Sequence, residues 1–330
     1  MKTTISDVAR LAGVSTATVS HTINNTRYVS SETKIKVYRA IDQLGYTPDA
    51  SARSFRTGKR KTIGFIVPDI SNRFFGTMIE SVENALSEKG YHLIIANTKE
   101  DMDREETNLR LLTAGLVDGL LVASTMDNFQ RLNALIPAGF PVVLVDRTFD
   151  GHRYDSVSVS CFQSVYDSVR RLIQRGKRRV GLIAGLPRLS TTQERLRAYR
   201  AALTDQGLEV EEDLIRCGNT MDNSASSRLD ALLKRDCDAI LVCQGRMAAV
   251  TIAYLEQKGL RRDLELVSFV DYDTHPYEFY FNRADQIVQP VEELGRAAGE
   301  QILLRIETPG APVRERVLSS VYQPYNGAGS

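Results

Sequence analysis

From Thr62 onward, short apolar runs rich in β-branched residues alternate with amphipathic stretches, and this alternation restricts the fold more than any other feature of the sequence. The candidate strands are Ile63–Pro68, His92–Asn97, Gly119–Ala123, Val142–Val145, Ser156–Val159, Val180–Ile183, Ala239–Val242 and Glu265–Val270. Amphipathic helices such as Phe75–Glu88 and Ser164–Arg175 lie between several of them. Near-continuous apolar strands that recur every 25–30 residues or so, separated by helices, are typical of βαβ units and of a parallel sheet.

The series of strands and helices runs twice, with a break near Ser160. We therefore expect two α/β lobes that face each other across a cleft. Ligands of open α/β sheets bind beyond the carboxyl ends of the strands. The candidate ligand-binding residues are consequently those that directly follow the strands.

The first 47 residues have a purely helical pattern. A capping box at Thr4–Asp7 precedes an apolar stripe that ends at a glycine, and a second short helix follows over residues 16–23. A third helix begins at Ser30 or Ser31 and stops at Gly45. Two short helices joined by a glycine-containing turn form a helix-turn-helix unit, whose second helix enters the major groove of DNA. The outward-facing side chains of that helix are Thr16, Ala17, Ser20 and His21. An ordinary helical bundle is the alternative.

The charge of the chain is divided unevenly. Residues 1–61 contain eleven Lys and Arg against four Asp and Glu, whereas the remaining residues contain 31 against 37. A basic head on an acidic body favours binding of the head to a polyanion. The segment Asp49–Gly58 is too short for a stable isolated helix, and its Phe55 lies between two arginines. Such a segment suits a kinked minor groove, although a plain basic linker explains it equally well.

Several short motifs resemble those of one known family. The run ISDVARLAGVSTATVS at Ile5–Ser20, the run LGYTP at Leu44–Pro48 and the tripeptide Ala52-Arg53-Ser54 resemble the DNA-reading head and hinge of the lactose/galactose repressor (LacI/GalR) family of bacterial transcription regulators. The resemblance extends over essentially the whole chain. It implies an all-α helix-turn-helix head joined to a two-lobed α/β body like the periplasmic sugar-binding proteins.

The resemblance also implies the domain boundaries. The head comprises residues 1–47, the hinge helix and linker residues 48–61, and the body, which binds the effector and dimerises, residues 62–330. Within the body, the N-lobe comprises about 62–159 and 291–318, and the C-lobe about 160–289 and 319–330. The chain is then expected to cross between the lobes near Ser160, Gln289-Pro290 and Ser319-Ser320.

The family resemblance assigns roles in DNA binding to individual residues. The base-reading side chains are Thr16, Ala17 and His21, and the phosphate-binding side chains are Ser15, Thr18, Ser20, Asn24 and Tyr28. Thr4 in the head and Ala52, Phe55 and Arg56 in the hinge complete the set. Phe55 stands where the family usually has leucine, so it provides a bulkier wedge between base pairs.

Residues at the strand ends, taken together with the resemblance, indicate an effector pocket. Its candidate residues are Asn72, Arg73, Phe74, Phe75, Asp146, Arg147, Arg195, Thr220, Gln244, Arg246 and Asp273. Two of them have structural alternatives, because Phe75 could belong to the core and Asp146 could cap a helix or form a loop salt bridge. The sequence departs from the common family pattern at Thr220, at Gln244-Gly245-Arg246 and at Asp271, so the familiar ligands cannot be transferred.

Two classes of effector fit these residues. Arg73, Arg147, Arg195 and Arg246 in one cleft favour an anionic effector, a sugar phosphate or a sugar acid, because guanidinium groups match such anions. Alternatively, aspartates such as Asp146 and Asp273 neutralise these arginines around a neutral sugar or a nucleoside. The sequence leaves both classes open.

Other functional classes find little support. The four cysteines are scattered, which argues against a zinc site or a disulfide framework. The sequence contains no phosphate loop and no nucleophile elbow, and Asp271-x-Asp273-x-His275 is too compact to close a metal shell. We therefore expect no catalytic activity, no cofactor and no metal. A sugar-transport protein shares the body but needs an export signal, which the N-terminus lacks.

The expected protein is a cytoplasmic transcriptional regulator, most simply a repressor, with no membrane segment. Two heads on one two-fold axis need two half-sites, so its expected partners are a second copy of the chain and a near-palindromic double-stranded operator. The C-terminus carries no leucine heptads, which favours a dimer over a tetramer. The remaining expected partner is a small sugar-like effector in the cleft.

Overall fold

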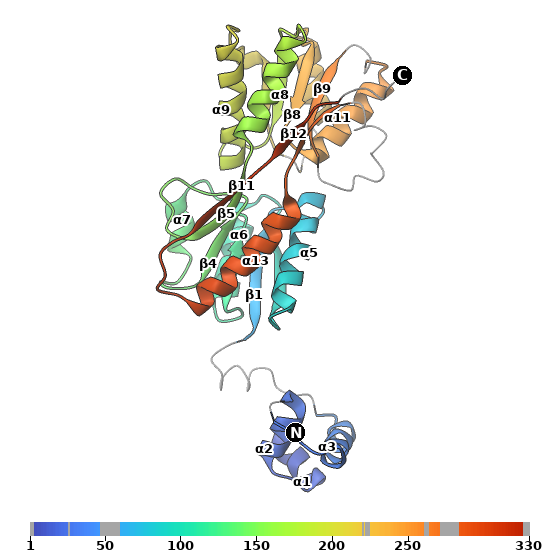
Figure 1. The fold of residues 1–330 in the computed structure, drawn as a ribbon, viewed down its shortest axis with the longest axis vertical. Helices are drawn as coiled ribbons and strands as arrows, with labels where there is room; N and C mark the ends of the chain where they lie inside the picture. Colours follow the sequence, from blue (N-terminus) through green and yellow to red (C-terminus); the bar gives the residue numbers. More distant parts are fainter. Residues whose placement is uncertain are drawn as a thin grey trace. The chain divides into compact units, whose positions relative to one another are not determined.

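The computed structural model describes residues 3–25, 27–46, 60–219, 221, 225–260, 264–270 and 284–325. The chain forms two compact units, Met1–Arg60 and Lys61–Ser330, which are called the head and the body below (Figure 1). The hinge candidates Ala52, Phe55 and Arg56 and the effector candidates Thr220 and Asp273 lie outside the described residues. In the described part of the chain, no helix is both long and apolar enough to cross a membrane.

The head contains helices α1 (Ile5–Ala12), α2 (Thr16–Asn24) and α3 (Ser31–Leu44). Their caps follow from the sequence: Thr4 and Asp7 form the complete capping box of α1, and Ser15 and Ser30 cap α2 and α3. Gly13 and Gly45 end α1 and α3 in the left-handed conformation that glycine adopts without strain. A small apolar core holds the three helices together, and its buried members are Val8, Ala9, Val19, Val37 and Ala40. The predicted helical head is confirmed.

In its described residues, the body contains two six-stranded sheets, which define its two lobes. The N-lobe sheet has the order β11-β5-β4-β3-β1-β2, and all its neighbours are parallel. Its strands are β1 (Thr62–Val67), β2 (His92–Asn97), β3 (Gly119–Val122), β4 (Val142–Val145), β5 (Asp155–Ser160) and β11 (Glu315–Ser319). The C-lobe sheet has the order β12-β10-β9-β8-β6-β7, and only β12 is antiparallel to its neighbour. Its strands are β6 (Val180–Ala184), β7 (Ile215–Cys217), β8 (Ala239–Val242), β9 (Glu265–Val270), β10 (Asp285–Val288) and β12 (Val321–Gln323).

Helices cover both sheets, as the alternating sequence pattern predicts. The N-lobe carries α5 (Arg73–Ser87), α6 (Met102–Thr113), α7 (Phe129–Ala134) and α13 (Val291–Glu307), and the C-lobe carries α8 (Phe162–Gln174), α9 (Ser190–Asp205), α10 (Ala225–Leu233) and α11 (Gly245–Gln257). Each of the eight predicted strands has a counterpart in these sheets, and the two-lobed α/β fold is confirmed. The prediction missed β7, β10, β11 and β12, because these short strands lack a continuous apolar run.

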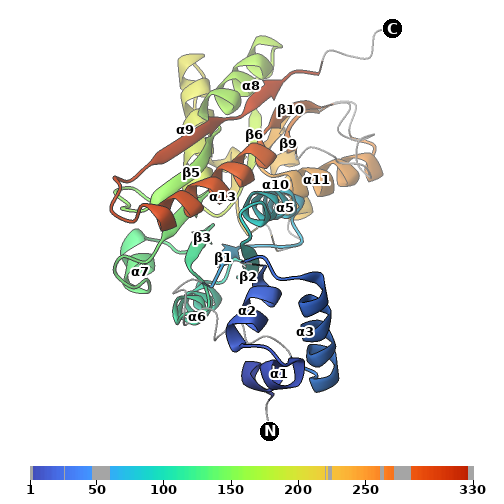
Figure 2. The ribbon, with the colours of Figure 1, turned by 60° about the horizontal axis from the view of Figure 1, so that its bottom comes forward.

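The chain passes between the two sheets three times. It leaves the N-lobe sheet after β5 at Ser160, returns after β10, and crosses again between β11 and β12. After the second crossing, α13 lies beside α5 and along the N-lobe sheet (Figures 1 and 2). Gly295 permits this close approach, because a Cβ there would lie 2.6 Å from the Met78 carbonyl oxygen of α5. The C-terminal part of the chain therefore completes the N-lobe.

A buried ion pair fastens α13 to β5. Asp155 is 1% exposed and accepts hydrogen bonds from Arg305 Nε at 2.9 Å, Arg305 Nη2 at 2.5 Å and Gln301 Nε2 at 2.6 Å. The Arg314 N–H donates to the same carboxylate at 2.9 Å, immediately before β11. Burial alone favours a higher pKa for Asp155, but these hydrogen bonds lower the pKa below its ordinary value. The ionised carboxylate thus joins three segments that are distant in the sequence.

The substitution Asp155→Asn tests this junction. We expect the free energy of unfolding to fall by about 3 kcal/mol at pH 7, because Arg305, whose side chain is 13% exposed, then loses its charged partner. A lowered pKa stabilises the fold above the ordinary value of 3.8, so the difference from the wild-type protein narrows as the pH falls below 3.8. Urea unfolding followed by circular dichroism measures both effects. The control is Asp167→Asn, which removes a surface pair with Arg170 and costs about 0.5 kcal/mol; equal losses for the two variants would contradict the prediction.

Candidate functional site

The outward face of α2 is the candidate DNA-reading surface of the head. Thr16 and Ala17 are exposed, and Ser20 and His21 are half-buried. Ser15 and Thr18 lie within hydrogen-bonding distance of each other at 2.9 Å, so one loop and one helix position these hydroxyls together. The face is small and polar, and it therefore permits close approach to base edges.

The other DNA-binding candidates of the head have varied surroundings. Asn24 Nδ2 donates to the Ser20 carbonyl oxygen at 2.8 Å, and the Thr4 hydroxyl donates to Asp7 at 2.6 Å. Thr4 is therefore occupied by its capping role, whereas Tyr28 is 95% exposed.

A cavity of about 50 Å³ lies beyond the carboxyl ends of strands from both lobes of the body. Seven of the predicted effector-binding residues line it: Asn72, Phe74, Phe75, Asp146, Arg147, Arg195 and Gln244. Seven further lining residues were not predicted: Asp69, Glu100, Thr191, Cys243, Gly245, Phe269 and Gln289. Asp69 and Cys243 lie at or just beyond strand ends, so the rule that predicted Asp146 could have found them. Gln289 directly follows β10, a strand that the sequence did not predict, and Glu100 lies three positions beyond β2.

Arg147 and Glu100 form a buried ion pair at one wall of the cavity. Arg147 Nη1 and Nη2 donate to the two Glu100 oxygens at 3.0 and 2.6 Å, and Nη1 also donates to the Ser124 carbonyl oxygen at 3.2 Å. The two side chains are 6% and 3% exposed. The attraction between the two charges offsets the free-energy cost of removing each group from water. This pair joins the loops that follow β4 and β2.

Asp146 lies next to this pair but is bound less tightly. Its backbone is in the left-handed region at φ 64°, and its Oδ2 is 3.9 Å from Arg147 Nε. No donor in the described part of the chain makes a hydrogen bond to its carboxylate. Burial raises the pKa of Asp146 above its ordinary value, although Arg147 and Arg195 oppose this shift. The carboxylate is therefore available to accept hydrogen bonds from a ligand.

Arg195 forms the opposite wall from the C-lobe. Its Nη1 donates to the Cys243 carbonyl oxygen at 2.7 Å, and its guanidinium lies 4.1 Å from the centre of the Phe269 ring. Burial raises the pKa of the Cys243 thiol to about 12, so this neighbour remains neutral. The charge of Arg195 is thus held by a carbonyl dipole and an aromatic face.

The aromatic pair after β1 belongs both to the cavity and to the core. Phe74 and Phe75 are 8% and 4% exposed and pack edge to face at 5.2 Å between ring centres. Asn72 caps α5 by accepting a hydrogen bond from the Phe74 N–H. Phe75 therefore lines the cavity and also belongs to the core, the two roles that the sequence left open.

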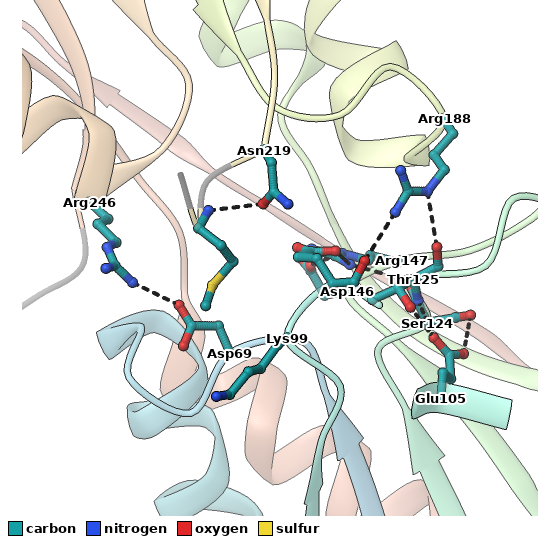
Figure 3. A network of polar contacts seen from close by, with 12 residues as sticks. Asp69, Lys99, Glu105, Ser124, Thr125, Asp146, Arg147, Arg188, Asn219 and Arg246 are labelled. Atoms are coloured by element: carbon teal, nitrogen blue, oxygen red, sulfur yellow. Dashed lines mark hydrogen bonds and ion pairs between the residues drawn. The ribbon is translucent and has the colours of Figure 1, made fainter. Parts of the chain in front are cut away.

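The remaining two arginines do not line the cavity. Arg73 is exposed on the first turn of α5. Arg246 Nη1 of α11 instead reaches across the lobes to Asp69 Oδ2 at 3.0 Å (Figure 3). The four predicted arginines are therefore not brought together in one cleft.

Several polar atoms around the cavity have no hydrogen-bonding partner among the residues that the structure describes. They are Gln244 Oε1, Gln289 Nε2, Arg147 Nε and Arg195 Nε. A buried polar atom without a partner is costly, so such a cluster indicates a place where a ligand supplies the missing contacts. In the described ranges, no group of His, Cys, Asp or Glu side chains is arranged to hold a metal ion.

The substitution Asp146→Asn tests the electrostatic state of the cavity without a ligand. A raised carboxyl pKa costs stability as the pH rises above 3.8, so we expect the variant to be more stable than the wild-type protein at pH 8, by about 1 kcal/mol. Asparagine tolerates the left-handed conformation at this position. The difference in unfolding free energy between the variant and the wild-type protein, measured by urea titration, should shrink toward pH 4. The control Asp150→Asn in the exposed loop should leave the unfolding free energy unchanged. A less stable Asp146→Asn protein at pH 8 would mean that the carboxylate is a stabilising charge.

Comparison with known proteins gives a consistent family assignment. Residues 60–322 match the family model described as periplasmic binding proteins and sugar binding domain of LacI family, and residues 4–49 match that of the bacterial regulatory proteins, lacI family. The chain is 35% identical over 308 residues to the HTH-type transcriptional repressor PurR of Aliivibrio salmonicida, covering 92% of each chain. It is 34% identical over 319 residues to the ribose operon repressor of Haemophilus influenzae, covering 96% of this chain and 95% of the relative.

Solved structures show the same architecture. A complex of the transcriptional regulator CelR with cellobiose is 27% identical and has a TM-score of 0.72, covering 99% of this chain and 100% of that one. The Lac repressor dimer bound to operator and the anti-inducer ONPF has a TM-score of 0.82 over 99% of this chain and 100% of that one. Its 20% identity supports the fold alone.

Proposed function

We infer that this chain, which belongs to the LacI family of bacterial regulatory proteins and is a DNA-binding repressor of that family, responds to a small effector. The effector is uncharged, bears hydroxyl groups and binds in the body cleft. Its binding controls the affinity of the protein for operator DNA. Repressors of this family bind operator DNA and small-molecule effectors, and they are not enzymes. The pairing of charges around the cavity is the observation that carries the proposal.

The charges at the cavity balance one another. The Glu100 carboxylate accepts hydrogen bonds from both terminal nitrogens of Arg147, and the Asp69 carboxylate accepts one from Arg246. Asp146 then stands opposite Arg195, so the described residues that line the cavity leave no excess of positive charge for a phosphate or a carboxylate. The unpaired amide atoms of Gln244 and Gln289 and the Asp146 carboxylate suit hydroxyl or ring-nitrogen groups instead. One similar protein supports this class, because the solved CelR structure is a complex with the neutral sugar cellobiose.

The effector cavity lies between the two lobes, so a bound effector contacts both of them. Effector binding that changes the relative position of the lobes gives the body two arrangements and shifts the segments that cross between the lobes. The difference in operator-binding free energy between the two arrangements is then the coupling free energy between the effector site and the DNA-binding surface.

The head supplies the DNA contacts. Thr16, Ala17 and His21 read bases in the major groove, and Ser15, Thr18, Ser20, Asn24 and Tyr28 hold phosphates. The hinge residues Ala52, Phe55 and Arg56 enter the minor groove at the centre of a near-palindromic operator. The protein acts on bacterial DNA and thus in the cytoplasm.

Dimerisation uses the free edge of the N-lobe sheet. β2 is the edge strand, and its Ile94 and Ile95 are 39% and 45% exposed on opposite faces of the strand. An open apolar edge favours pairing with another chain. A second copy of this chain places the second head on the other operator half-site.

The substitution His21→Ala tests base reading by the head. We expect affinity for an operator selected in vitro to fall about tenfold, because one base contact contributes about 1–3 kcal/mol to discrimination. Affinity for a scrambled duplex should fall less than twofold. Fluorescence anisotropy at fixed salt measures both, with Lys36→Ala on α3 as the control, whose side chain pairs with Glu32 on the surface. Equal losses of affinity for the two duplexes would mean that His21 contacts the DNA backbone and not the bases.

A thermal-shift screen of the full chain tests the effector class. The panel contains neutral sugars, nucleosides, sugar phosphates and sugar acids. A ligand of the native state adds about 2.7 kcal/mol of stability at one hundred times its Kd, so a true effector raises Tm measurably. We expect a neutral compound to raise Tm and Asp146→Asn to abolish that rise. A response to phosphates or acids alone would overturn the neutral class and restore the anionic one.

A further inference from the structure

Lys61, the first residue of the body, is held from both sides by the N-lobe sheet. It directly precedes β1, which lies between β2 and β3. Its N–H donates to Asp118 Oδ2 at 2.7 Å, and Asp118 directly precedes β3. Its carbonyl oxygen accepts a hydrogen bond at 2.8 Å from the N–H of His92, the first residue of β2. Lys61 is therefore bound by the segments that lead into both neighbouring strands.

The side chain of Lys61 adds a third contact. Its ammonium lies 4.2 Å from the centre of the Tyr91 ring, and Nζ also donates to the Lys89 carbonyl oxygen at 3.4 Å. The Tyr91 ring is 6% exposed. Burial raises the pKa of the Tyr91 phenol, and the Asp118 and Glu307 carboxylates raise the pKa further. The ring therefore remains neutral, and its face attracts the cation.

The backbone of Lys61 has a conformation that residues other than glycine rarely adopt. Its φ is 57°, in the left-handed region. Such a conformation persists only where the surrounding structure fixes it, and the contacts with Asp118, His92 and Tyr91 provide that restraint. The direction of the chain at this point is thus set by the N-lobe and not by the local preference of lysine.

Lys61 is also the residue through which the body is joined to the head. The two compact units are Met1–Arg60 and Lys61–Ser330, so one peptide bond connects them. Every covalent path from the body to the DNA-reading helix α2 passes through this bond. A restraint on Lys61 therefore also restrains the start of the connection to the head.

We propose that Asp118 and Tyr91 are positioning residues for operator binding, because they anchor Lys61 and so fix the way in which the chain leaves the body. A chain that leaves the body in a fixed way loses less conformational freedom when the head binds its operator. A scrambled duplex accepts many placements of the head through phosphate contacts alone. The anchor therefore contributes to discrimination between duplexes more than to general affinity for DNA.

The substitution Asp118→Ala tests the anchor through a change whose electrostatic effect has the opposite sign. Loss of a carboxylate makes the body less negative, which by itself strengthens binding to a polyanion. We expect instead that affinity for a duplex selected by this protein from a random library falls about tenfold, and that affinity for a scrambled duplex does not fall. Fluorescence anisotropy of the full chain without effector, at fixed salt, measures both. Unchanged or higher affinity for the selected duplex, or equal losses for the two duplexes, would overturn the proposal.

Hydrogen–deuterium exchange of the DNA-free full chain tests the anchor itself. The His92 N–H donates to the Lys61 carbonyl oxygen, so its exchange reports whether Lys61 is held. We expect about tenfold faster exchange at His92 in Asp118→Ala than in the wild-type protein. Asp118→Asn keeps an acceptor oxygen and should restore most of the protection and most of the affinity for the selected duplex. Unchanged exchange at His92 in Asp118→Ala would mean that Asp118 does not anchor Lys61.

Tyr91 provides a second series with a matched control. Tyr91→Phe keeps the ring beside the ammonium and should discriminate between the two duplexes as the wild-type protein does. Tyr91→Leu removes the ring and should lower the ratio of the two affinities about threefold. Lys89→Ala removes an exposed side chain next to the anchor but keeps its carbonyl group, so that ratio should not change. If Asp118→Ala does not fold, this series decides, because equal ratios for Tyr91→Leu and Tyr91→Phe would contradict the anchor.

The test is independent of the effector proposal. It uses no effector, so a failure of the anchor leaves the neutral effector class untouched, and a screen without a hit leaves the affinity ratios untouched. A head that does not read bases would select no duplex from the library, which would contradict the DNA contacts proposed above. The exchange at His92 would still decide whether Asp118 anchors Lys61.

Discussion

The ion pair between Arg147 and Glu100 is the interaction on which the geometry of the cleft depends. These residues follow β4 and β2, two strands that do not pair with each other in the N-lobe sheet. The same guanidinium also binds the Ser124 carbonyl oxygen, so one side chain joins the loops after β2, β3 and β4. Removal of either partner would leave a buried charge without its counter-ion, which is strongly destabilising. The strand-end loops are therefore held together by contacts within the protein itself.

This pairing explains how a cleft that contains arginines can suit an uncharged ligand. Among the described residues that line the cavity, Arg147 is held by a carboxylate and Arg195 by a carbonyl and an aromatic ring. The polar atoms left there without hydrogen-bonding partners belong to the amides of Gln244 and Gln289 and to the two guanidinium Nε–H groups. Recognition then rests on hydrogen-bond direction more than on charge. The same bonds connect the cavity wall to the loop that contacts the C-lobe, so ligand recognition and lobe contact share one polar network.

The sequence predicted the parts of the fold that have a local pattern. Strands in the middle of a sheet are apolar on both faces, so runs such as Val142–Val145 are recognisable without neighbours. β11 and β12 escaped prediction because they are edge strands with mostly exposed residues, and only their pairing partners make them strands. The same distinction applies to the site. Arg147 was predicted from its place after a strand, whereas the exposure of Arg73 depends on how the first turn of α5 faces the cleft.

The sequence by itself determined a helix-turn-helix head, a two-lobed α/β body and the strand ends where a ligand would bind, because caps, periodicity and apolar runs act over a few residues. The tertiary structure decided which charges neutralise one another. Glu100 lies 47 positions from Arg147, and Asp69 lies 177 positions from Arg246. The strength of an ion pair depends on distance in space and on burial, which sequence spacing does not specify. The electrostatic character of the cleft therefore became apparent only once the chain had folded.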